Sequence, residues 1–158
     1  MPRDIPYSQF NFLVSWAAAP GSEGAKLSET EVKAGFQEVG GLGLEITVAE
    51  YRPGNAPTNG PQKITTMFKV PDITLKRGVI GERDLWDWIK AVRDGSQKSL
   101  KTVTIKLLGE DRDSENPAQE WELKRARPMK YTGPALNGKG TDVAIEELVL
   151  ACEEIDLK

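Results

Sequence analysis

The sequence contains no histidine and only one cysteine, Cys152, among its 158 residues. The absence of histidine removes the commonest general base and the commonest transition-metal ligand. A lone cysteine cannot form an internal disulfide, and Cys152 ends a strand-like run without a cationic neighbour to lower its pKa. We therefore expect Cys152 to be a small buried apolar group, and these absences count against an enzyme.

The sequence also lacks a basic excess and a long apolar run. Its 21 basic and 24 acidic residues give a net charge of −3, so nucleic-acid binding is not expected as its main role. No stretch approaches the roughly 18 apolar residues of a membrane span, which predicts no membrane insertion by the subunit itself. Residues 1–7 lack the apolar core of a signal peptide, so we expect synthesis in the cytoplasm without one.

What the sequence does contain is a series of short alternating segments separated by glycine- and proline-rich turns. The length suits a single domain covering residues 1–158. The pattern predicts a mainly β fold, a two-sheet β-sandwich or barrel. The expected strands are 10–16, 32–39, 44–51, 64–70, 102–108, 120–131 (interrupted by Pro128) and 143–152, with a short extended piece at 73–77 and an acidic tail at the end.

A long polar loop separates two of these strands. Residues 52–63 read RPGNAPTNGPQK, which is too polar and too broken to carry a core. Together with the strands at 44–51 and 64–70 it predicts an extended hairpin. A loop of this length is unusual in a compact domain unless it has a function.

One short α-helix is predicted at about residues 84–94, with Asp84 as its N-cap and Gly95 at its end. Its apolar side chains recur at helical spacing and form one stripe: Leu85, Trp88, Ile89 and Val92. Trp86 lies off that stripe, and is either a residue at the boundary of the core or an interface anchor.

No catalytic, metal or cofactor site is predicted. Asp111, Asp113 and Glu115 lack the glycine and the terminal glutamate of an EF-hand loop. Glu146 and Glu147 would point to opposite faces of a strand, so they cannot act as a carboxylate pair.

The polar faces of the four clearest strands mix threonine with charges of both signs. They consist of Glu45, Thr47, Thr65, Lys69, Thr102, Thr104, Lys106, Glu122 and Lys124. From the residues alone, a solvated sheet face is the favoured interpretation.

Several segments, in this order along the chain, resemble the contractile phage tail-tube protein family, the inner-tube proteins of phage-like contractile injection systems, similar to the haemolysin-coregulated protein fold. The segments are FNFLVSW, GFQEVGGLGLEI, EYRPG, KITTMFKVPDITLKRGV, DLWDWI, TVTIKLLGEDR, WELKRARPMKY and TDVAIEELVLACEEI. The chain departs from the family mainly in extra residues at 17–29.

The resemblance implies a structural subunit that is not an enzyme. Hexameric rings would stack head to tail into a hollow tube, which is driven through a target envelope when a surrounding sheath contracts. The implied partners are further copies of the chain, a sheath protein, baseplate or hub and tape-measure proteins, and a cargo effector or DNA in the lumen. The chain would be assembled into a phage tail or phage-like particle and released by lysis.

The resemblance also assigns roles to residues. The mixed polar faces become candidates for the lumen wall. The hairpin tip would reach the neighbouring ring through Arg52, Pro53, Asn55, Thr58, Asn59 and Pro61. The helix would lie on the outer side, near the subunit boundary and the sheath, with Arg77 and Trp86 as interface candidates. Arg77 would pair either with an acid on a neighbour or in an exposed salt bridge.

Two other interpretations stay open at this point. One is a type VI secretion tube protein of similar fold. The other belongs to a different class, a ligand- or carbohydrate-binding β-sandwich, although the four tryptophans are scattered over separate elements. The residues do not distinguish a phage tail from a bacteriocin or an extracellular injection system. They also leave open the cargo, the lumen charge, a second tube paralogue and the number of subunits in a ring.

Overall fold

The computed structural model describes residues 4–18, 35–81, 83–95 and 99–158, and it is mainly β, as predicted. The elements are β1 (Phe12–Ala18), β2 (Phe36–Gly40), β3 (Glu45–Tyr51), β4 (Gln62–Lys69), β5 (Ile73–Gly78), α1 (Asp84–Arg93), β6 (Lys101–Leu107), β7 (Gln119–Thr132), β8 (Ile145–Ala151) and β9 (Glu154–Leu157). The predicted loop after residue 17, the extra residues at 17–29 and the start of the strand at 32–39 lie largely outside the described residues.

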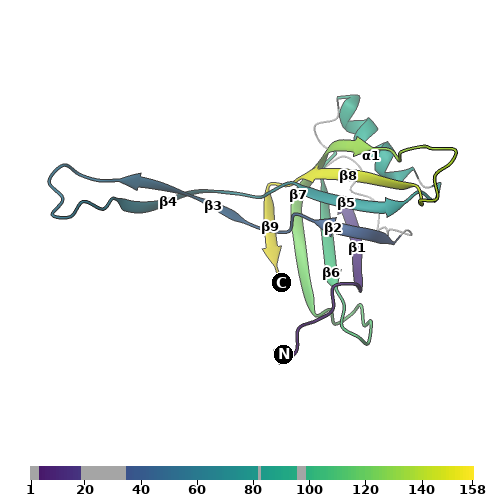
Figure 1. Ribbon diagram of the computed structural model, residues 1–158, viewed down its shortest axis with the longest axis horizontal. Coiled ribbons are helices and arrows are strands. Elements are labelled where there is room, and N and C mark those ends of the chain that lie inside the picture. Colours follow the sequence, from purple (N-terminus) through teal and green to yellow (C-terminus); the bar gives the residue numbers. More distant parts are fainter. Residues whose placement is uncertain (1–3, 19–34, 82, 96–98) are drawn as a thin grey trace.

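The 14-residue strand β7 connects two layers of antiparallel sheet. Its first half pairs with β6 and β9, and its second half pairs with β8. The strand order is β1-β6-β7-β8-β5-β2, with β9 beside β7. Between the two halves, one residue of β6 faces Lys124 and Arg125 of β7, and Arg125 has a φ of 52°. Such a bulge bends a strand, and the two layers cross at a steep angle (Figure 1).

The core fills the space between these two layers. Alternate residues of β1, β5, β6, β7 and β8 point into it, which is the period-2 pattern of a half-buried strand. The buried apolar residues are Val14, Trp16, Ile73, Leu75, Leu85, Trp88, Val103, Ile105, Leu108, Leu123, Ala126, Leu148 and Leu150. Leu85 and Trp88 come from α1, which packs against β7 and contributes the predicted apolar stripe.

The helix begins differently from the prediction. Arg83 occupies the N-cap position without a side-chain capping bond, and Asp84 is the first helical residue. The Asp84 carboxylate accepts the Leu85 N–H at 3.0 Å and hydrogen bonds from Arg77, so it is engaged elsewhere than at an N-cap. The predicted end is confirmed, because Gly95 has a φ of 101° and its N–H donates to the Val92 carbonyl at 3.1 Å.

The predicted extended hairpin is present, formed by β3 and β4, and it projects far from the body (Figure 1). Every residue of both strands is exposed. The expectation of one buried face is therefore wrong for this hairpin, because neither layer of the body lies over it. A two-stranded hairpin is at best marginally stable alone, so a surface outside the described chain is needed to hold it.

Two further expectations are corrected at the C-terminal end. Pro128 does not interrupt β7, because the ladder accommodates it with a register shift between Pro128 and Lys130. The presumed acidic tail contains β9, which pairs with the first half of β7. Its charges are paired across the strands, with the Lys124 ammonium 2.7 Å from the Asp156 carboxylate.

Gly41 at the base of the hairpin should be intolerant of any side chain. Its φ is 91°, and a Cβ there would lie 2.1 Å from the backbone oxygen of Asp72. We expect Gly41→Ala to lower the free energy of unfolding by about 2 kcal/mol, measured by urea denaturation. Gly40→Ala is the matched control, because a Cβ at Gly40 meets nothing within 4 Å. Equal effects of the two changes would contradict this account of the hairpin base.

Candidate functional site

The loop at the hairpin tip is held in one conformation by Arg52, one of the residues predicted to contact the neighbouring ring. The Arg52 side chain donates from Nε to the Thr58 carbonyl at 3.1 Å and from Nη2 to the Ala56 carbonyl at 3.5 Å. The Ala56 N–H donates to the Pro53 carbonyl at 3.1 Å. All six predicted inter-ring residues, Arg52, Pro53, Asn55, Thr58, Asn59 and Pro61, therefore lie at one end of the molecule on a braced loop.

The hairpin separates one predicted lumen residue from the others. Ile46 pairs with Phe68 and Val48 with Thr65, so Thr47 alone faces two residues of β4. This bulge reverses the alternation beyond it. Glu45, Thr47 and Lys69 share one face, whereas Thr65 lies on the face of Ile46, Val48 and Phe68. The expectation that all four share a face is wrong, because the bulge moves Thr65 to the other face. The residue pattern gives no sign of a bulge.

The other five lumen candidates lie together on the outer face of the layer formed by β1, β6, β7 and β9. Thr104 pairs with Glu122, and Glu122 pairs with Asp156. The Lys158 ammonium forms a salt bridge with the Glu122 carboxylate at 2.5 Å. Thr102, Thr104, Lys106 and Glu122 line a shallow depression of about 270 Å³, and Lys124 lies beside it. This face is not continuous with the hairpin, so the nine candidates lie on three separate surfaces: this face and the two faces of the hairpin.

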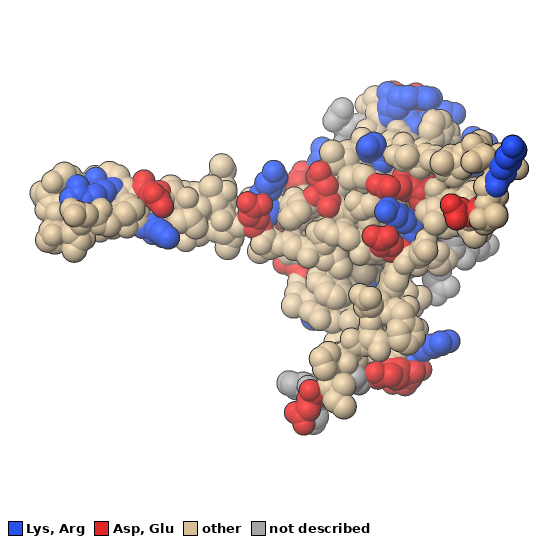
Figure 2. Space-filling view, viewed as in Figure 1, with Lys and Arg blue, Asp and Glu red and all other residues tan. Residues whose placement is uncertain are grey.

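The second layer carries a further polar face that the sequence interpretation missed. The outward residues Glu38, Lys76, Glu147 and Thr132 pair in one row across β2, β5, β8 and β7. The Lys76 ammonium lies 3.7 Å from the Glu38 carboxylate. The charges alternate in sign along the row. Charges of both signs are interspersed over the body, whereas the hairpin is mostly uncharged (Figure 2).

This four-stranded layer has two free edges among the described residues. β2 pairs only with β5, and β7 beyond Ala126 pairs only with β8. Free edges present backbone donors and acceptors that invite pairing with another chain. Because all neighbours are antiparallel and the layer has four strands, the two edge strands run in opposite directions.

Arg77, predicted at a surface, is instead fully buried at 0% exposure. Its Nε donates to Glu146 Oε1 at 2.6 Å, and its Nη atoms donate to the Asp84 carboxylate. The Tyr131 hydroxyl donates to Glu146 Oε2 at 2.8 Å. The prediction of an interface or exposed salt bridge is wrong, because Arg77 shares the inward face of β5 with Ile73 and Leu75.

The buried network joins four elements: β5, β7, β8 and α1. Burial alone lowers the pKa of Arg77, but the hydrogen bonds and charges of Asp84 and Glu146 outweigh burial and raise it. Burial, followed by the hydrogen bond to Glu146, raises the pKa of Tyr131. All these groups are partnered, which is the condition for a tolerable buried charge. The network therefore fixes α1 on the sheet.

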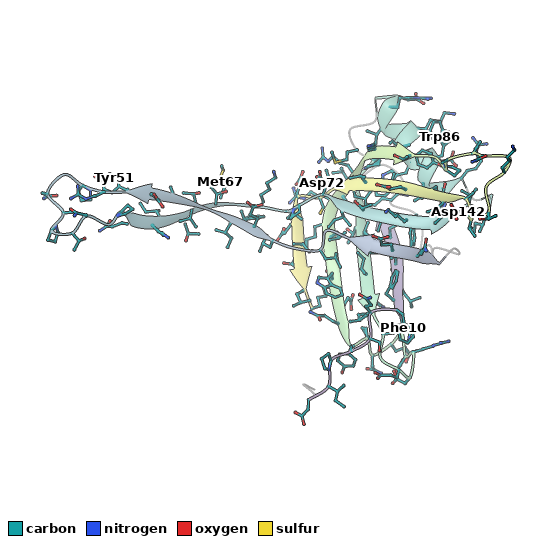
Figure 3. All side chains as sticks on the ribbon, viewed as in Figure 1. Phe10, Tyr51, Met67, Asp72, Trp86 and Asp142 are labelled. Atoms are coloured by element: carbon teal, nitrogen blue, oxygen red, sulfur yellow. The ribbon has the colours of Figure 1, made fainter. Side chains whose placement is uncertain are left out.

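Trp86 lies on the outer side of α1 and remains 39% exposed. Its ring meets Tyr131 edge-on at 5.5 Å between centroids, and the Arg93 guanidinium lies 6.0 Å from it. Trp86 is therefore placed at the surface of the helix (Figure 3). Its role as an interface anchor stays a prediction.

Cys152 should react slowly in the folded protein. Burial, with a smaller effect of the Asp72 charge, raises its pKa to about 11, against about 8.5 for a free thiol. The pKa of the thiol is higher in the folded protein than in the unfolded protein. Its contribution to the free energy of unfolding is therefore complete below about pH 8.5 and is lost as the pH rises from about 8.5 to about 11. At pH 8.5 we expect iodoacetamide to alkylate native protein about 100-fold more slowly than urea-denatured protein. Similar rates would contradict the burial.

Neither a cluster of metal-ligand side chains nor a membrane-spanning helix occurs among the residues that the structure describes. No group of three or more potential ligand side chains is gathered within them. No helix in the described ranges is long and apolar enough to cross a membrane.

Comparison with known proteins gives a family and a fold. The sequence model of the family described as "T4-like virus tail tube protein gp19" matches residues 8–156. A chain of the PVC sheath–tube complex of an extracellular contractile injection system, in the extended state, is 26% identical. It has a TM-score of 0.80, with 98% of this chain and 93% of that chain covered.

Two other solved structures share the fold. A chain of the anti-feeding prophage baseplate, 6-fold symmetrised, is 20% identical with a TM-score of 0.82, covering 99% of this chain and 97% of that chain. A crystal structure of an Hcp protein is 12% identical with a TM-score of 0.50, covering 93% and 91%. No curated protein sequence matches the chain.

Proposed function

Because the chain belongs to the T4-like virus tail tube protein family, we propose that it is the subunit of a hollow inner tube, in which six copies close each ring and rings stack head to tail. Its role is structural rather than catalytic. The observation that carries the proposal is the pair of free edges on one four-stranded layer, together with a hairpin exposed along its whole length.

The direction of the edge strands supports ring closure. A copy rotated about an axis roughly along these strands keeps its strand directions, so its β7 lies antiparallel to the β2 of the first copy. Each copy then adds four strands to one continuous antiparallel barrel, and closure removes the free edges. Such a head-to-tail contact is heterologous, which generates a ring when the rotation closes.

The lumen wall is then the outer face of the β7-β8-β5-β2 layer. Its row of Glu38, Lys76, Glu147 and Thr132 keeps the mixed character that a non-adhesive channel needs, without one dominant charge. Glu45, Thr47 and Lys69 continue that wall on the hairpin. The predicted group from Thr102 to Lys124 faces outward in this arrangement, on the other layer.

The hairpin gives the contact along the tube axis. It leaves the body beyond β2 and β5 and points away from the loop that contains Asp142 (Figure 3). Stacked rings would therefore bring the tip of one copy against the body of the next. Apolar side chains on both faces, including Ile46, Phe68 and Tyr51, would then be covered.

The proposal of the remaining partners is based on the family and on the similar chain of the sheath–tube complex. We propose a sheath around the tube, a baseplate or hub and a tape-measure protein at its ends, and a cargo effector or DNA within it. Synthesis in the cytoplasm and release of the finished particle by lysis belong to the same proposal.

Native mass spectrometry of the purified chain tests ring closure. We expect a closed species of six times the 17.4 kDa subunit mass, with few intermediate species, because each added copy leaves two edges until the ring is complete. A protein that stays monomeric at the highest soluble concentration, or a continuous series of masses without a closed species, would contradict the proposed ring.

A further inference from the structure

The four-stranded layer β7-β8-β5-β2 carries a protrusion at each end. At one end the hairpin of β3 and β4 continues β2 and β5 away from the body (Figure 1). At the other end the β7–β8 loop, residues 133–144, joins β7 to β8. The register fixes these ends, because Gly78, the last residue of β5, pairs with Ile145, the first residue of β8. The two protrusions therefore point in opposite directions, as the positions of Tyr51 and Asp142 show (Figure 3).

The two protrusions lie on different halves of the layer. In the strand order β7-β8-β5-β2, the loop leaves from the first two strands and the hairpin from the last two. Around a closed ring the pattern repeats every four strands, or about 19 Å at the usual strand spacing of about 4.8 Å. Each hairpin fills two of these strand positions, so a gap about 10 Å wide separates neighbouring hairpins. A gap of that width accommodates the two chain segments of a loop.

The hairpins leave uncovered surface on both sides of that gap. β3 and β4 pair only with each other among the described strands, so each hairpin has two free backbone edges. Large apolar side chains are exposed along the hairpin, including Ile46, Val48, Met67 and Phe68. Free edges and exposed apolar groups both favour contact with another chain.

The opposite end of the layer is also apolar. Leu136 and Val143 of the β7–β8 loop are 87% and 78% exposed, more than any other large apolar side chain in the described ranges. Val79 and Ile80, directly after β5, are exposed as well. The Val79 N–H donates to the Ala144 carbonyl at 3.0 Å, so this segment lies against the base of the loop. Exposed apolar groups therefore gather at both ends of the layer, where stacked rings would meet.

The tip of the β7–β8 loop is a defined turn. Asn137 accepts the Lys139 N–H through Oδ1 and the Gly140 N–H through its carbonyl, each at 3.0 Å. The loop carries one basic and one acidic side chain, Lys139 and Asp142. Because these charges cancel and the hairpin is mostly uncharged, the loop meets no strong like-charge repulsion between two hairpins (Figure 2).

We propose that the β7–β8 loop of each copy enters the gap between two hairpins of the neighbouring ring, so that stacked rings interdigitate. The inference rests on the proposed rings and their stacking, and it names the segment that receives the hairpin. Both protrusions occur once per copy, so a single rotation between neighbouring rings places every loop in a gap. The joint then fixes that rotation and keeps each ring from turning against the next, as a tube that is driven as one body requires.

Cross-linking from the hairpin tip tests this joint, because interdigitation places the tip of each protrusion beside the base of the other. In a Cys152→Ala background, Thr58→Cys is combined either with Val143→Cys at the base of the loop or with Lys139→Cys at its tip. Assembled tubes are treated with a short bismaleimide. We expect strong linkage for the Val143 pair and weak linkage for the Lys139 pair. The covalent oligomers should exceed one ring in size, because the link runs along the tube.

Electron microscopy of the same samples separates the joint from the stacking on which it rests. Thr58→Cys with Leu157→Cys is the matched control, because Leu157 is exposed but belongs to β9 in the other layer. Tubes in which the Val143 pair links no better than the Lys139 pair or the Leu157 control would overturn the interdigitation and leave the proposed tube intact. Single rings or dispersed protein from the Cys152→Ala parent would overturn the stacking itself, and the joint with it.

A charge variant gives an independent measurement. Val143→Glu should leave the thermal unfolding midpoint of the subunit unchanged, because the side chain is exposed. It should raise the protein concentration at which half of the rings are stacked by about tenfold or more, because the joint would bury a charge without a partner. Leu157→Glu is the control and should leave that concentration unchanged. Equal effects of the two changes would overturn the placement of Val143 in the joint.

Discussion

Replacing Arg77 with methionine is expected to lower the free energy of unfolding by about 3–5 kcal/mol. Arg77 is fully buried, and its loss leaves the Glu146 carboxylate, itself only 5% exposed, with the Tyr131 hydroxyl but no countercharge. It also frees Asp84, through which α1 is tied to β5. Urea denaturation followed by circular dichroism measures the change.

A neighbouring residue on the same strand provides the matched control. Lys76 lies on the outer face of β5 and pairs with Glu38 at 3.7 Å in a largely exposed ion pair. Lys76→Met should change the free energy of unfolding by less than about 0.5 kcal/mol. The double variant Arg77→Met, Glu146→Leu should be more stable than Arg77→Met alone, because it removes the buried unpaired carboxylate. If Arg77→Met behaves like Lys76→Met, the network does not hold the helix.

Deleting residues 55–60 from the hairpin tip should leave the folded body and the ring intact and abolish stacking. The deleted segment lies far from the core and contains both carbonyl groups that hold the Arg52 side chain. The thermal unfolding midpoint should therefore stay close to that of the intact chain, whereas electron microscopy should show single rings in place of tubes.

A length-preserving variant separates the shape of the tip from its reach. Replacing residues 55–60 by alternating glycine and serine keeps the loop length but removes Pro57 and its fixed φ. We expect this variant to stack more weakly than the intact chain and better than the deletion. Tubes of normal length from the deletion variant would show that the tip has no role between rings.

The features that follow from local pattern were predictable from the sequence. The hairpin could be predicted because a loop rich in proline, glycine and asparagine separates two alternating segments. The helix could be predicted because four apolar residues fall at helical spacing before Gly95. Both signals come from neighbours in the chain, so no tertiary information was needed.

The buried ion network was present in the sequence but was misinterpreted. Arg77 has the same parity as Ile73 and Leu75, and Glu146 has the same parity as Leu148 and Leu150. Two opposite charges on inward faces indicate a buried pair, because neither could be tolerated alone. The strand β9 was missed in a similar way, since Ile155 and Leu157 alternate within a segment dominated by its acidic residues.

Bulges and sheet edges could not be derived from the pattern. The reversal at Thr65 depends on how β4 pairs with β3, and the turn of β7 between layers depends on Arg125 adopting a positive φ. Likewise, only the strand order shows that β2 and the second half of β7 are edges of one layer. These long-range facts decide which polar face is proposed to line the tube.

The central claim is that this chain works by assembling into a tube. The most direct measurement is negative-stain electron microscopy of the purified protein at high concentration, with and without a co-expressed sheath protein. We expect hollow rings and stacked tubes. Protein that stays dispersed as monomers even with the sheath present would contradict the account and favour a ligand-binding sandwich.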